Sequence, residues 1–243
     1  MERDLHVTSP MMAGPDVQAL QERLAALGYT PGVPDGFYGP TTASAVRTFQ
    51  RDAKLDEDGV VGPKTRAALA TATGRPPPVA SLTGQKALAE AQKYIGTVEQ
   101  PAGSNRTEFG LWFGANGVAW CNIFVSYCFS VGADYILAKG FPGGRSHGIF
   151  AGKGCSYVPT TAAWLRSAGM WVGKSQPLPG DIVIYNLHGG RPDHIGIVSR
   201  VLGKDTFEAV EGNTSFQNDS NGGAVMLRSR HLTRVDGFGR ITD

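Results

Sequence analysis

The chain has 243 residues, of which 41% are hydrophobic and 18% charged, a composition typical of soluble globular proteins. Its net charge of +2 is the difference between 23 basic and 21 acidic residues, an excess too small to indicate the strongly basic face typical of nucleic-acid binding. No stretch approaches about 18 consecutive apolar residues, and the N-terminal "MERDLHVTSPMM" lacks the apolar core of a signal peptide. We therefore expect no membrane partner and no export through a leader.

An internal repeat lies early in the chain. "DGFYGPTTASAV" begins at Asp35 and returns as "DGVVGPKTRAAL" at Asp58, an offset of 58 − 35 = 23 residues. In each copy an Asp-Gly turn leads through a second glycine into proline, which is typical of a turn that starts a helix. The preceding "PDVQALQERLAALGY" places its valine and leucines on one helical face. The pattern predicts a small all-α domain, a three-helix bundle over residues 1–73.

A proline-rich segment follows, with Pro76, Pro77 and Pro78 flanked by small residues. This composition favours an extended, semi-rigid chain, so residues 74–84 are predicted to be a linker. The rest begins with helices and continues with "DIVIYNL", "HIGIVSRVL", "TFEAVEG" and "GAVMLRSRHL", which are β-branched or alternate in polarity. Helices followed by consecutive strands predict an α+β domain with an antiparallel sheet over residues 85–243.

Cys121 is a candidate nucleophile. It follows Trp120 and the turn-forming "GANG", so it falls at the start of a helix predicted over residues 121–131. A helix N-terminus favours the thiolate, which is the nucleophilic form of cysteine. Cys128 lies two turns further along the helix, about 10 Å away, so the two thiols cannot form a disulfide. The alternative is that both cysteines only pack within an apolar helix.

A candidate base for this thiol lies on the downstream strands. His194 opens the strand "HIGIV", and Glu211 and Asn213 lie two residues apart near the end of the next strand. Side chains at i and i+2 share a sheet face, so these three can point to the same side if the strands are neighbours. The result would be a cysteine, a histidine base and a carboxylate that orients the base. The alternative is a capping histidine and a solvated Glu-Gly-Asn turn.

No metal site or cofactor is predicted. His147, His188, His194 and Cys155 do not have the i, i+4 or Cys-x-x-Cys spacing of zinc ligands. "SNRTEFG" lacks the alternating acidic oxygens of a calcium loop. The glycine-rich "GGRSHG" and "GKGCS" lack the spacing of a phosphate-binding loop.

Four motifs in order, "AWCNIFVSYC", "PGDIVIYN", "DHIGIV" and "EGNT", resemble the cysteine, histidine-dependent amidohydrolase/peptidase (CHAP) family. The resemblance implies a papain-like fold with Cys121 as nucleophile and His194 as base. It further implies that Glu211 orients the histidine and that Asn213 is another polar member of the site. The repeat, through "DGFYGPTT" and "DGVVGPKT", resembles the three-helix peptidoglycan-binding domain. Some members of the CHAP family bind calcium through an acidic loop before the cysteine, and this chain lacks that loop.

Together the two resemblances imply a peptidoglycan hydrolase with the architecture of a bacteriophage endolysin. Such an enzyme stays in the host cytoplasm until lysis and then cleaves the bacterial cell wall. The bond would be an amide, cut either by an N-acetylmuramoyl-L-alanine amidase or by a peptidoglycan endopeptidase. A bacterial remodelling hydrolase or toxin of the same chemistry and a non-catalytic wall-binding protein are the alternatives. Peptidoglycan is the expected partner, and we expect a monomer.

Four further residues are expected to contact the substrate. Asn116 is a candidate second donor to the oxyanion, beside the backbone N–H at the start of the helix; the alternative is an asparagine that only forms the turn. Trp120 directly precedes the nucleophile. Asp35 and Asp58 mark the two Asp-Gly turns, near which the wall-binding groove is expected.

Overall fold

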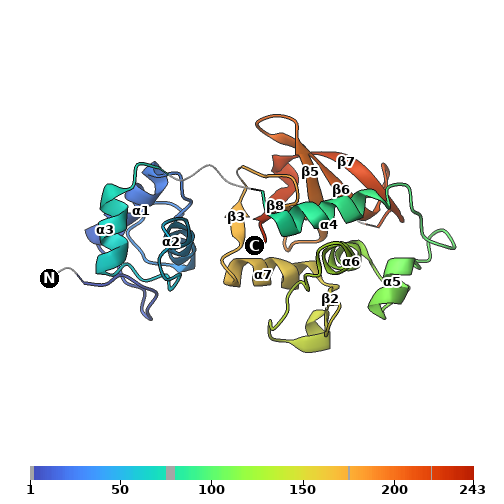
Figure 1. Ribbon diagram of the computed structural model, residues 1–243, viewed down its shortest axis with the longest axis horizontal. Coiled ribbons are helices and arrows are strands. Elements are labelled where there is room, and N and C mark those ends of the chain that lie inside the picture. Colours follow the sequence, from blue (N-terminus) through green and yellow to red (C-terminus); the bar gives the residue numbers. More distant parts are fainter. Residues whose placement is uncertain (1–2, 75–79, 175, 220) are drawn as a thin grey trace. The chain divides into compact units, whose positions relative to one another are not determined.

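The computed structural model describes residues 3–74, 80–174, 176–219 and 221–243. The chain divides into two compact units, Met1–Pro77 and Pro78–Asp243, each with its own hydrophobic core (Figure 1). The predicted fold class is confirmed, because a helical unit precedes an α+β unit with an antiparallel sheet. The three prolines of the predicted linker, residues 74–84, lie outside the described residues.

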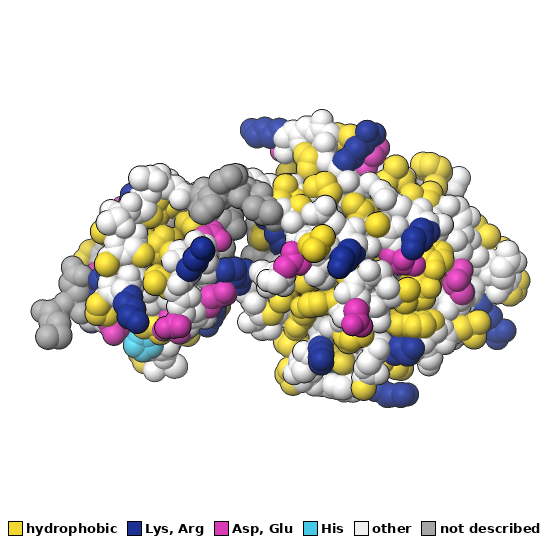
Figure 2. Space-filling model, viewed as in Figure 1, with side chains coloured by type: hydrophobic (Ala, Val, Ile, Leu, Met, Phe, Trp, Pro, Cys, Tyr) yellow, Lys and Arg dark blue, Asp and Glu magenta, His cyan; other side chains and the backbone are white. Residues whose placement is uncertain are grey.

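The described residues contain no helix whose length and apolar character would suit a bilayer. On the face drawn in Figure 2, basic and acidic side chains are interspersed over each unit. This mixture agrees with the small net charge of the chain.

Three helices build the N-terminal unit: α1 (Pro15–Ala26), α2 (Pro40–Asp52) and α3 (Pro63–Thr71). Each begins with a proline directly after a glycine. Proline suits this position because its fixed φ is helical and it has no N–H to leave unsatisfied in the first turn. The apolar faces of the helices meet in one core that includes Leu24 and Phe49.

The two repeats are stabilised by the same polar clamp, in which the glutamine is buried. In each, a glutamine amide from the preceding helix donates to the turn aspartate and to a threonine, and its carbonyl accepts the N–H of the turn glycine. The members are Gln21, Asp35, Gly36 and Thr42 in the first repeat and Gln50, Asp58, Gly59 and Thr65 in the second. The amide-to-carboxylate distances are 3.0 Å in the first repeat and 2.7 Å in the second. The sequence repeat thus encodes a glutamine clamp that holds each Asp-Gly turn.

The C-terminal unit combines helices with two antiparallel sheets. Its helices are α4 (Leu82–Gln92), α5 (Glu108–Phe113), α6 (Cys121–Ala133) and α7 (Val158–Ser167), with the 3-10 turns η1 (Gly144–His147) and η2 (Leu232–Arg234). The small sheet pairs β1 (Ile149–Phe150) with β2 (Gly154–Cys155). The main sheet contains β3 (Trp171–Gly173), β4 (Ile182–Tyr185), β5 (His194–Val201), β6 (Thr206–Thr214), β7 (Ala224–His231) and β8 (Val235–Gly239). Its spatial order is β3-β8-β4-β5-β6-β7.

The central strands of the main sheet are buried on both faces. Ile195 and Ile197 of β5 pack in one cluster with Phe124 of α6. Val198, the next residue of β5, belongs to a second cluster that includes Phe207 of β6. A strand buried on both faces is a continuous apolar run, as "IGIV" after His194 is. Polar groups buried in such a sheet require partners, because each unpaired one costs stability.

Helix α4 begins at Leu82, earlier than the start predicted at residue 85. Ser81 caps the helix, since its hydroxyl accepts the Gly84 N–H at 3.1 Å. The Asp243 carboxylate accepts the N–H groups of Leu82 and Thr83 at 2.6 and 2.8 Å. Part of the predicted linker is therefore the first turn of a helix, and a distant carboxylate that the local sequence does not indicate stabilises it.

Replacing Gln50 with leucine should destabilise the N-terminal unit by about 2 kcal/mol or more, because it leaves buried partners of the clamp unsatisfied. All four tryptophans lie in the C-terminal unit, so their fluorescence reports that unit alone. In a urea titration of the full chain, the circular dichroism transition of the helical unit should move to lower urea while the fluorescence transition stays. Gln18→Leu on the exposed surface of α1 is the control; equal shifts in both variants would contradict the clamp.

Candidate active site

Cys121 is the first residue of α6, with Trp120 at the N-cap position. The helix predicted over residues 121–131 is observed as Cys121–Ala133. The Cys121 side chain is nearly buried, with 5% of the residue surface exposed. Because first-turn N–H groups have no acceptor within a helix, the backbone N–H of Cys121 is available to a ligand.

The two other cysteines lie in the interior of the unit. All three cysteines are free thiols, so Cys121 and Cys128 form no disulfide, as predicted. Burial raises the pKa of Cys128 and of Cys155. Thiols with raised pKa values are poor nucleophiles at neutral pH, which leaves Cys121 as the candidate.

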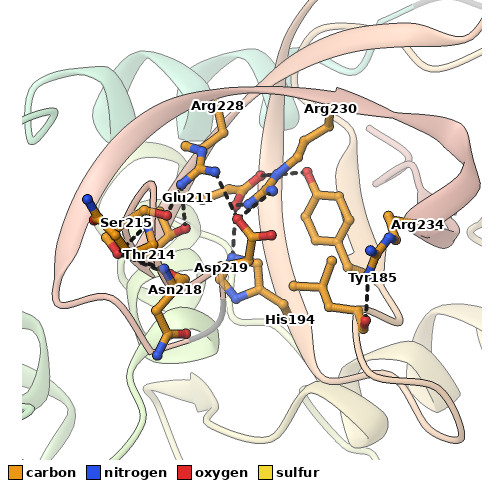
Figure 3. A network of polar contacts seen from close by, with 12 residues as sticks. Tyr185, His194, Glu211, Thr214, Ser215, Asn218, Asp219, Arg228, Arg230 and Arg234 are labelled. Carbon is orange, nitrogen blue, oxygen red and sulfur yellow. Dashed lines mark hydrogen bonds and ion pairs between the residues drawn. The ribbon is translucent and has the colours of Figure 1, made fainter.

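His194 is the fully buried first residue of β5, directly opposite Tyr185 of β4. Its Nε2 lies 2.9 Å from Oε2 of Glu211, and the ring points toward that carboxylate in Figure 3. The other ring nitrogen, Nδ1, makes no ordinary hydrogen bond within the described residues. Cys121 also acts on the pKa of this ring, and because Nε2 is bonded to Glu211, Nδ1 is the nitrogen available to the thiol.

The protonation of His194 follows from these neighbours. Burial alone lowers the pKa of His194, but the neighbouring Cys121 and the hydrogen bond and charge of Glu211 outweigh burial and raise the pKa to about 9. A raised pKa favours the imidazolium form. This is the form that results when the ring takes a proton from the thiol, so the site stabilises the product of that transfer.

Glu211 is fully buried in β6, and both of its carboxylate oxygens are satisfied (Figure 3). Oε1 accepts from the Tyr185 hydroxyl at 2.7 Å and from Nε of Arg230 at 2.8 Å. Oε2 accepts from Nη2 of Arg230 at 2.5 Å as well as from His194. Burial alone raises the pKa of Glu211, but the bonds and charges of Arg230 and His194 lower it to about 2. Glycine at position 196 leaves room for this side chain, since a Cβ there would lie 2.7 Å from Cγ of Glu211.

Asn213 has partners other than the predicted ones. A β-bulge lies between Glu211 and Thr214, and Asn213 adopts a left-handed φ of 58°. Its side chain donates to Oδ1 of Asn221 at 3.1 Å and accepts from the Gly223 N–H at 3.3 Å. The i, i+2 argument does not hold here, because a bulge interrupts the alternation of side chains. Asn213 fixes the loop after β6 within the described residues, and a part in catalysis stays a prediction.

Of the two residues expected beside the nucleophile, Asn116 remains a candidate for substrate contact and Trp120 does not. Asn116 lies on an exposed loop, where its carbonyl accepts the N–H groups of Thr107 and Gly117 at 3.0 and 3.2 Å. Its amide N–H₂ group therefore stays a candidate oxyanion donor. Trp120 is fully buried and stacks on Phe109 with ring centroids 5.8 Å apart. The expectation that Trp120 contacts the substrate is corrected, since its ring belongs to the core.

Asp35 and Asp58 have a structural role within their turns. Besides the glutamine, Oδ1 of each accepts the N–H two residues further on, from Phe37 at 2.9 Å and from Val60 at 2.8 Å. These backbone bonds are the main reason that the pKa of each carboxyl is lowered. Both aspartates are exposed, and their contact with a wall polymer stays a prediction.

Sequence reasoning missed Tyr185 and Arg230. Tyr185 ends the apolar strand "DIVIY", where it reads as one more core residue. Arg230 alternates with Arg228 along β7, a pattern that indicates a shared sheet face. Identifying Glu211 as the common partner of Tyr185 and Arg230 requires the strand order β4-β5-β6-β7, which the sequence does not provide.

The residues weighed as zinc ligands are dispersed. His188 pairs with Asp193 at 2.7 Å, and His147 bonds the carbonyl of Gly143 at 3.2 Å. Within the described part of the chain, no group of three or more His, Cys, Asp or Glu side chains could hold a metal ion.

Two family models match the chain, one in each unit. Residues 13–69 match a model described as a putative peptidoglycan binding domain, and residues 113–213 match the model of the CHAP domain. The second match contains Cys121, His194 and Glu211.

Curated relatives are named as N-acetylmuramoyl-L-alanine amidases. The N-acetylmuramoyl-L-alanine amidase CwlL of Bacillus licheniformis is 46% identical over 72 residues, which are 27% of this chain and 20% of the relative. The N-acetylmuramoyl-L-alanine amidase CwlM of Mycobacterium tuberculosis is 40% identical over 60 residues, 25% of this chain and 15% of the relative. The chain thus spans a fifth or less of the length of these relatives.

Two solved structures show partial likeness. The L,D-transpeptidase of Xylanimonas cellulosilytica is 48% identical over 29% of this chain and 34% of its own, with a TM-score of 0.27. The crystal structure of Ly7917 is 16% identical over 65% of this chain and 62% of its own, with a TM-score of 0.38.

The stability of the C-terminal unit should be greatest between about pH 4.5 and 6.5. The pKa of Glu211 falls from 4.5 to about 2 on folding, so its contribution is complete above pH 4.5 and is lost toward pH 2. The pKa of His194 rises from 6.5 to about 9, so its contribution is complete below pH 6.5 and is lost as the pH rises through 9. Urea unfolding followed by tryptophan fluorescence should show both declines, on the order of a few kcal/mol each.

His194→Gln should remove the alkaline decline, because the residue that titrates there is gone. Glu211→Gln should reduce the acid decline in the same way. An alkaline decline that persists unchanged in His194→Gln would assign the dependence to another group.

Proposed function

We propose that this chain is a peptidoglycan hydrolase that cleaves an amide bond of the bacterial cell wall, with Cys121 as its nucleophile. The observation that carries the proposal is the buried His194–Glu211 pair, in which the imidazole leaves Nδ1 without a partner among the described residues and has a pKa raised in part by Cys121. These residues lie within the match to the CHAP domain, and the other unit matches a peptidoglycan-binding domain. A cysteine beside a histidine that an acid orients is suited to acyl transfer.

In the proposed mechanism, Nδ1 of His194 takes the thiol proton and the Cys121 sulfur attacks the amide carbonyl carbon. The backbone N–H of Cys121, together with the amide of Asn116, would donate to the oxyanion of the tetrahedral intermediate. The imidazolium then protonates the leaving amine, and a thioester remains on Cys121. Water, deprotonated by His194, hydrolyses the thioester and restores the thiol.

The bond we favour is the amide between N-acetylmuramic acid and L-alanine. The names of the curated relatives support this choice. A peptidoglycan endopeptidase is the second candidate, because a stem or cross-bridge peptide presents the same carbonyl to the thiolate. Attack by the Cys121 sulfur with His194 as base would cleave either bond.

The biological setting that we favour is that of a phage endolysin, held in the host cytoplasm until lysis and then bound to the wall. Pairing a wall-binding unit with a cutting unit supports this setting, since tethering raises the local concentration of the active site near its polymer. A bacterial remodelling hydrolase or toxin would use the same chemistry. A neighbouring holin gene would identify the endolysin, and an immunity gene the toxin.

Cys121→Ala should lower the release of amino groups from purified peptidoglycan by at least about 10³-fold, because it removes the nucleophile. Mass spectrometry of the wild-type digest should find L-alanine as the new amino terminus; a different new terminus would identify an endopeptidase. Cys128→Ala is the matched control and should retain activity. Activity that survives in Cys121→Ala would remove the proposed nucleophile, and a wild-type chain that releases nothing would favour a non-catalytic wall binder.

The N-terminal unit should direct the chain to the wall. The full chain with Cys121→Ala should sediment with purified peptidoglycan, and a chain that starts at Pro78 and carries the same substitution should stay in the supernatant. Equal sedimentation of the two chains would show that the helical unit is only a spacer.

A further inference from the structure

A series of alternately charged side chains leads from the buried imidazole to the loop after β6 (Figure 3). His194 contacts Glu211, and Glu211 contacts Arg230. Nη1 of Arg230 then donates to Oδ1 of Asp219 at 2.8 Å, and Arg228 donates to the same oxygen at 2.8 Å. The Glu211 and Arg230 side chains are 0% and 9% exposed, whereas that of Asp219 is 42% exposed. The series therefore connects the base to the surface.

The geometry at Glu211 is a two-pronged fork. Nε and Nη2 of Arg230 bond the two different carboxylate oxygens, at 2.8 and 2.5 Å. A planar guanidinium that bonds both oxygens fixes the plane of the carboxylate. Because Oε2 is also the acceptor for His194, the fork sets the direction in which that oxygen faces the ring.

The charge of Arg230 matters as much as its shape. A fully buried carboxyl group favours the neutral form, and a neutral Glu211 would not stabilise an imidazolium. Among the groups that lower the pKa of Glu211, Arg230 is the foremost. Arg230 without a partner of its own would weaken the electrostatic effect of Glu211 on His194. The carboxylate of Asp219 pairs with Arg230 and offsets part of its positive charge.

We propose that Arg230 is the positioning residue of this site, which keeps Glu211 ionised and aligned with His194, and that Asp219 anchors Arg230 from the loop after β6. This inference rests on the proposed chemistry of Cys121 and His194, but not on the identity of the substrate. It names a residue of β7 outside the residues matched by the CHAP domain model.

The test measures the thiol and imidazole pair without any wall polymer. The rate at which iodoacetamide alkylates Cys121, with the site of modification located by mass spectrometry, is followed from about pH 4 to about pH 9. In Arg230→Gln the burial of Glu211 is no longer offset, so Glu211 protonates at a higher pH and the imidazolium loses its partner. The acid limb of the alkylation profile should move upward by about one pH unit or more, and kcat on peptidoglycan should fall at least about tenfold with little change in KM.

Arg230→Lys keeps the charge and should recover most of the acid limb. Asp219→Asn should move the limb upward by a smaller amount, because it removes the carboxylate that anchors Arg230 against Glu211. Arg200→Gln is the matched control, since Arg200 pairs with Glu208 on the exposed end of the same sheet and is 66% exposed. Its alkylation profile should equal that of the wild type.

A double variant covers the case in which Arg230→Gln fails to fold around an unpaired carboxylate. Glu211→Gln combined with Arg230→Gln removes both charges. If Arg230 acts through Glu211, adding Arg230→Gln to Glu211→Gln should change the alkylation profile and kcat by less than about twofold. A similar loss in both backgrounds, or an acid limb that does not move in a folded Arg230→Gln protein, would overturn the proposal.

The two proposals fail separately. If the wild type does not digest peptidoglycan but the alkylation limb shifts in Arg230→Gln, the wall substrate is wrong and the positioning role stands. If the wild type digests peptidoglycan and the limb stays fixed, the hydrolase stands and Arg230 only stabilises the sheet.

Discussion

A carboxylate that is fully removed from water constrains the whole C-terminal unit. Glu211 needs four bonds to remain charged in the interior, and they come from three different strands, with Tyr185 on β4, His194 on β5 and Arg230 on β7. Because an unpaired buried charge is costly, these strands are tied to one register. The site is therefore part of what specifies the sheet, and not an addition to a finished fold.

Two adjacent residues of β6 serve opposite faces of that strand. The side chain of Glu211 points to the polar network, whereas Gly212 lets the cysteine helix approach. A Cβ on Gly212 would lie 2.8 Å from Phe124 and 2.9 Å from Trp120. Glu211 thus supplies the acid of the site, and Gly212 allows the helix that carries Cys121 to pack closely against β6. This explains why the motif "EGNT" combines a charged residue with a glycine.

Local patterns were sufficient for much of the fold. The repeat predicted the helices of the first unit, and the "GANG" turn with its apolar continuation predicted that a helix starts at Cys121. The pairing of Glu211 with His194 followed from neighbouring strands and a common face. What failed depended on distant contacts or on local irregularity: the Asp243 cap of α4, the bulge at Asn213 and the burial of Trp120. Arg230 was missed for the same reason, since its importance depends on which strand lies beside β7.

In the first unit, the glutamine clamp holds the Asp-Gly turn in the same geometry whatever the length of the connection before it. Gln21 lies 14 residues before its aspartate, whereas Gln50 lies 8 residues before its own, yet the two clamps make the same bonds. The first connection is thus 14 − 8 = 6 residues longer at no cost to the turn. Insertions are tolerated where both ends of a segment are fixed by other contacts. Within this segment Leu24, Leu27 and Tyr29 are buried, whereas residues 32–34 are exposed. Related chains can therefore gain length and new surface at residues 32–34 without rebuilding the helices.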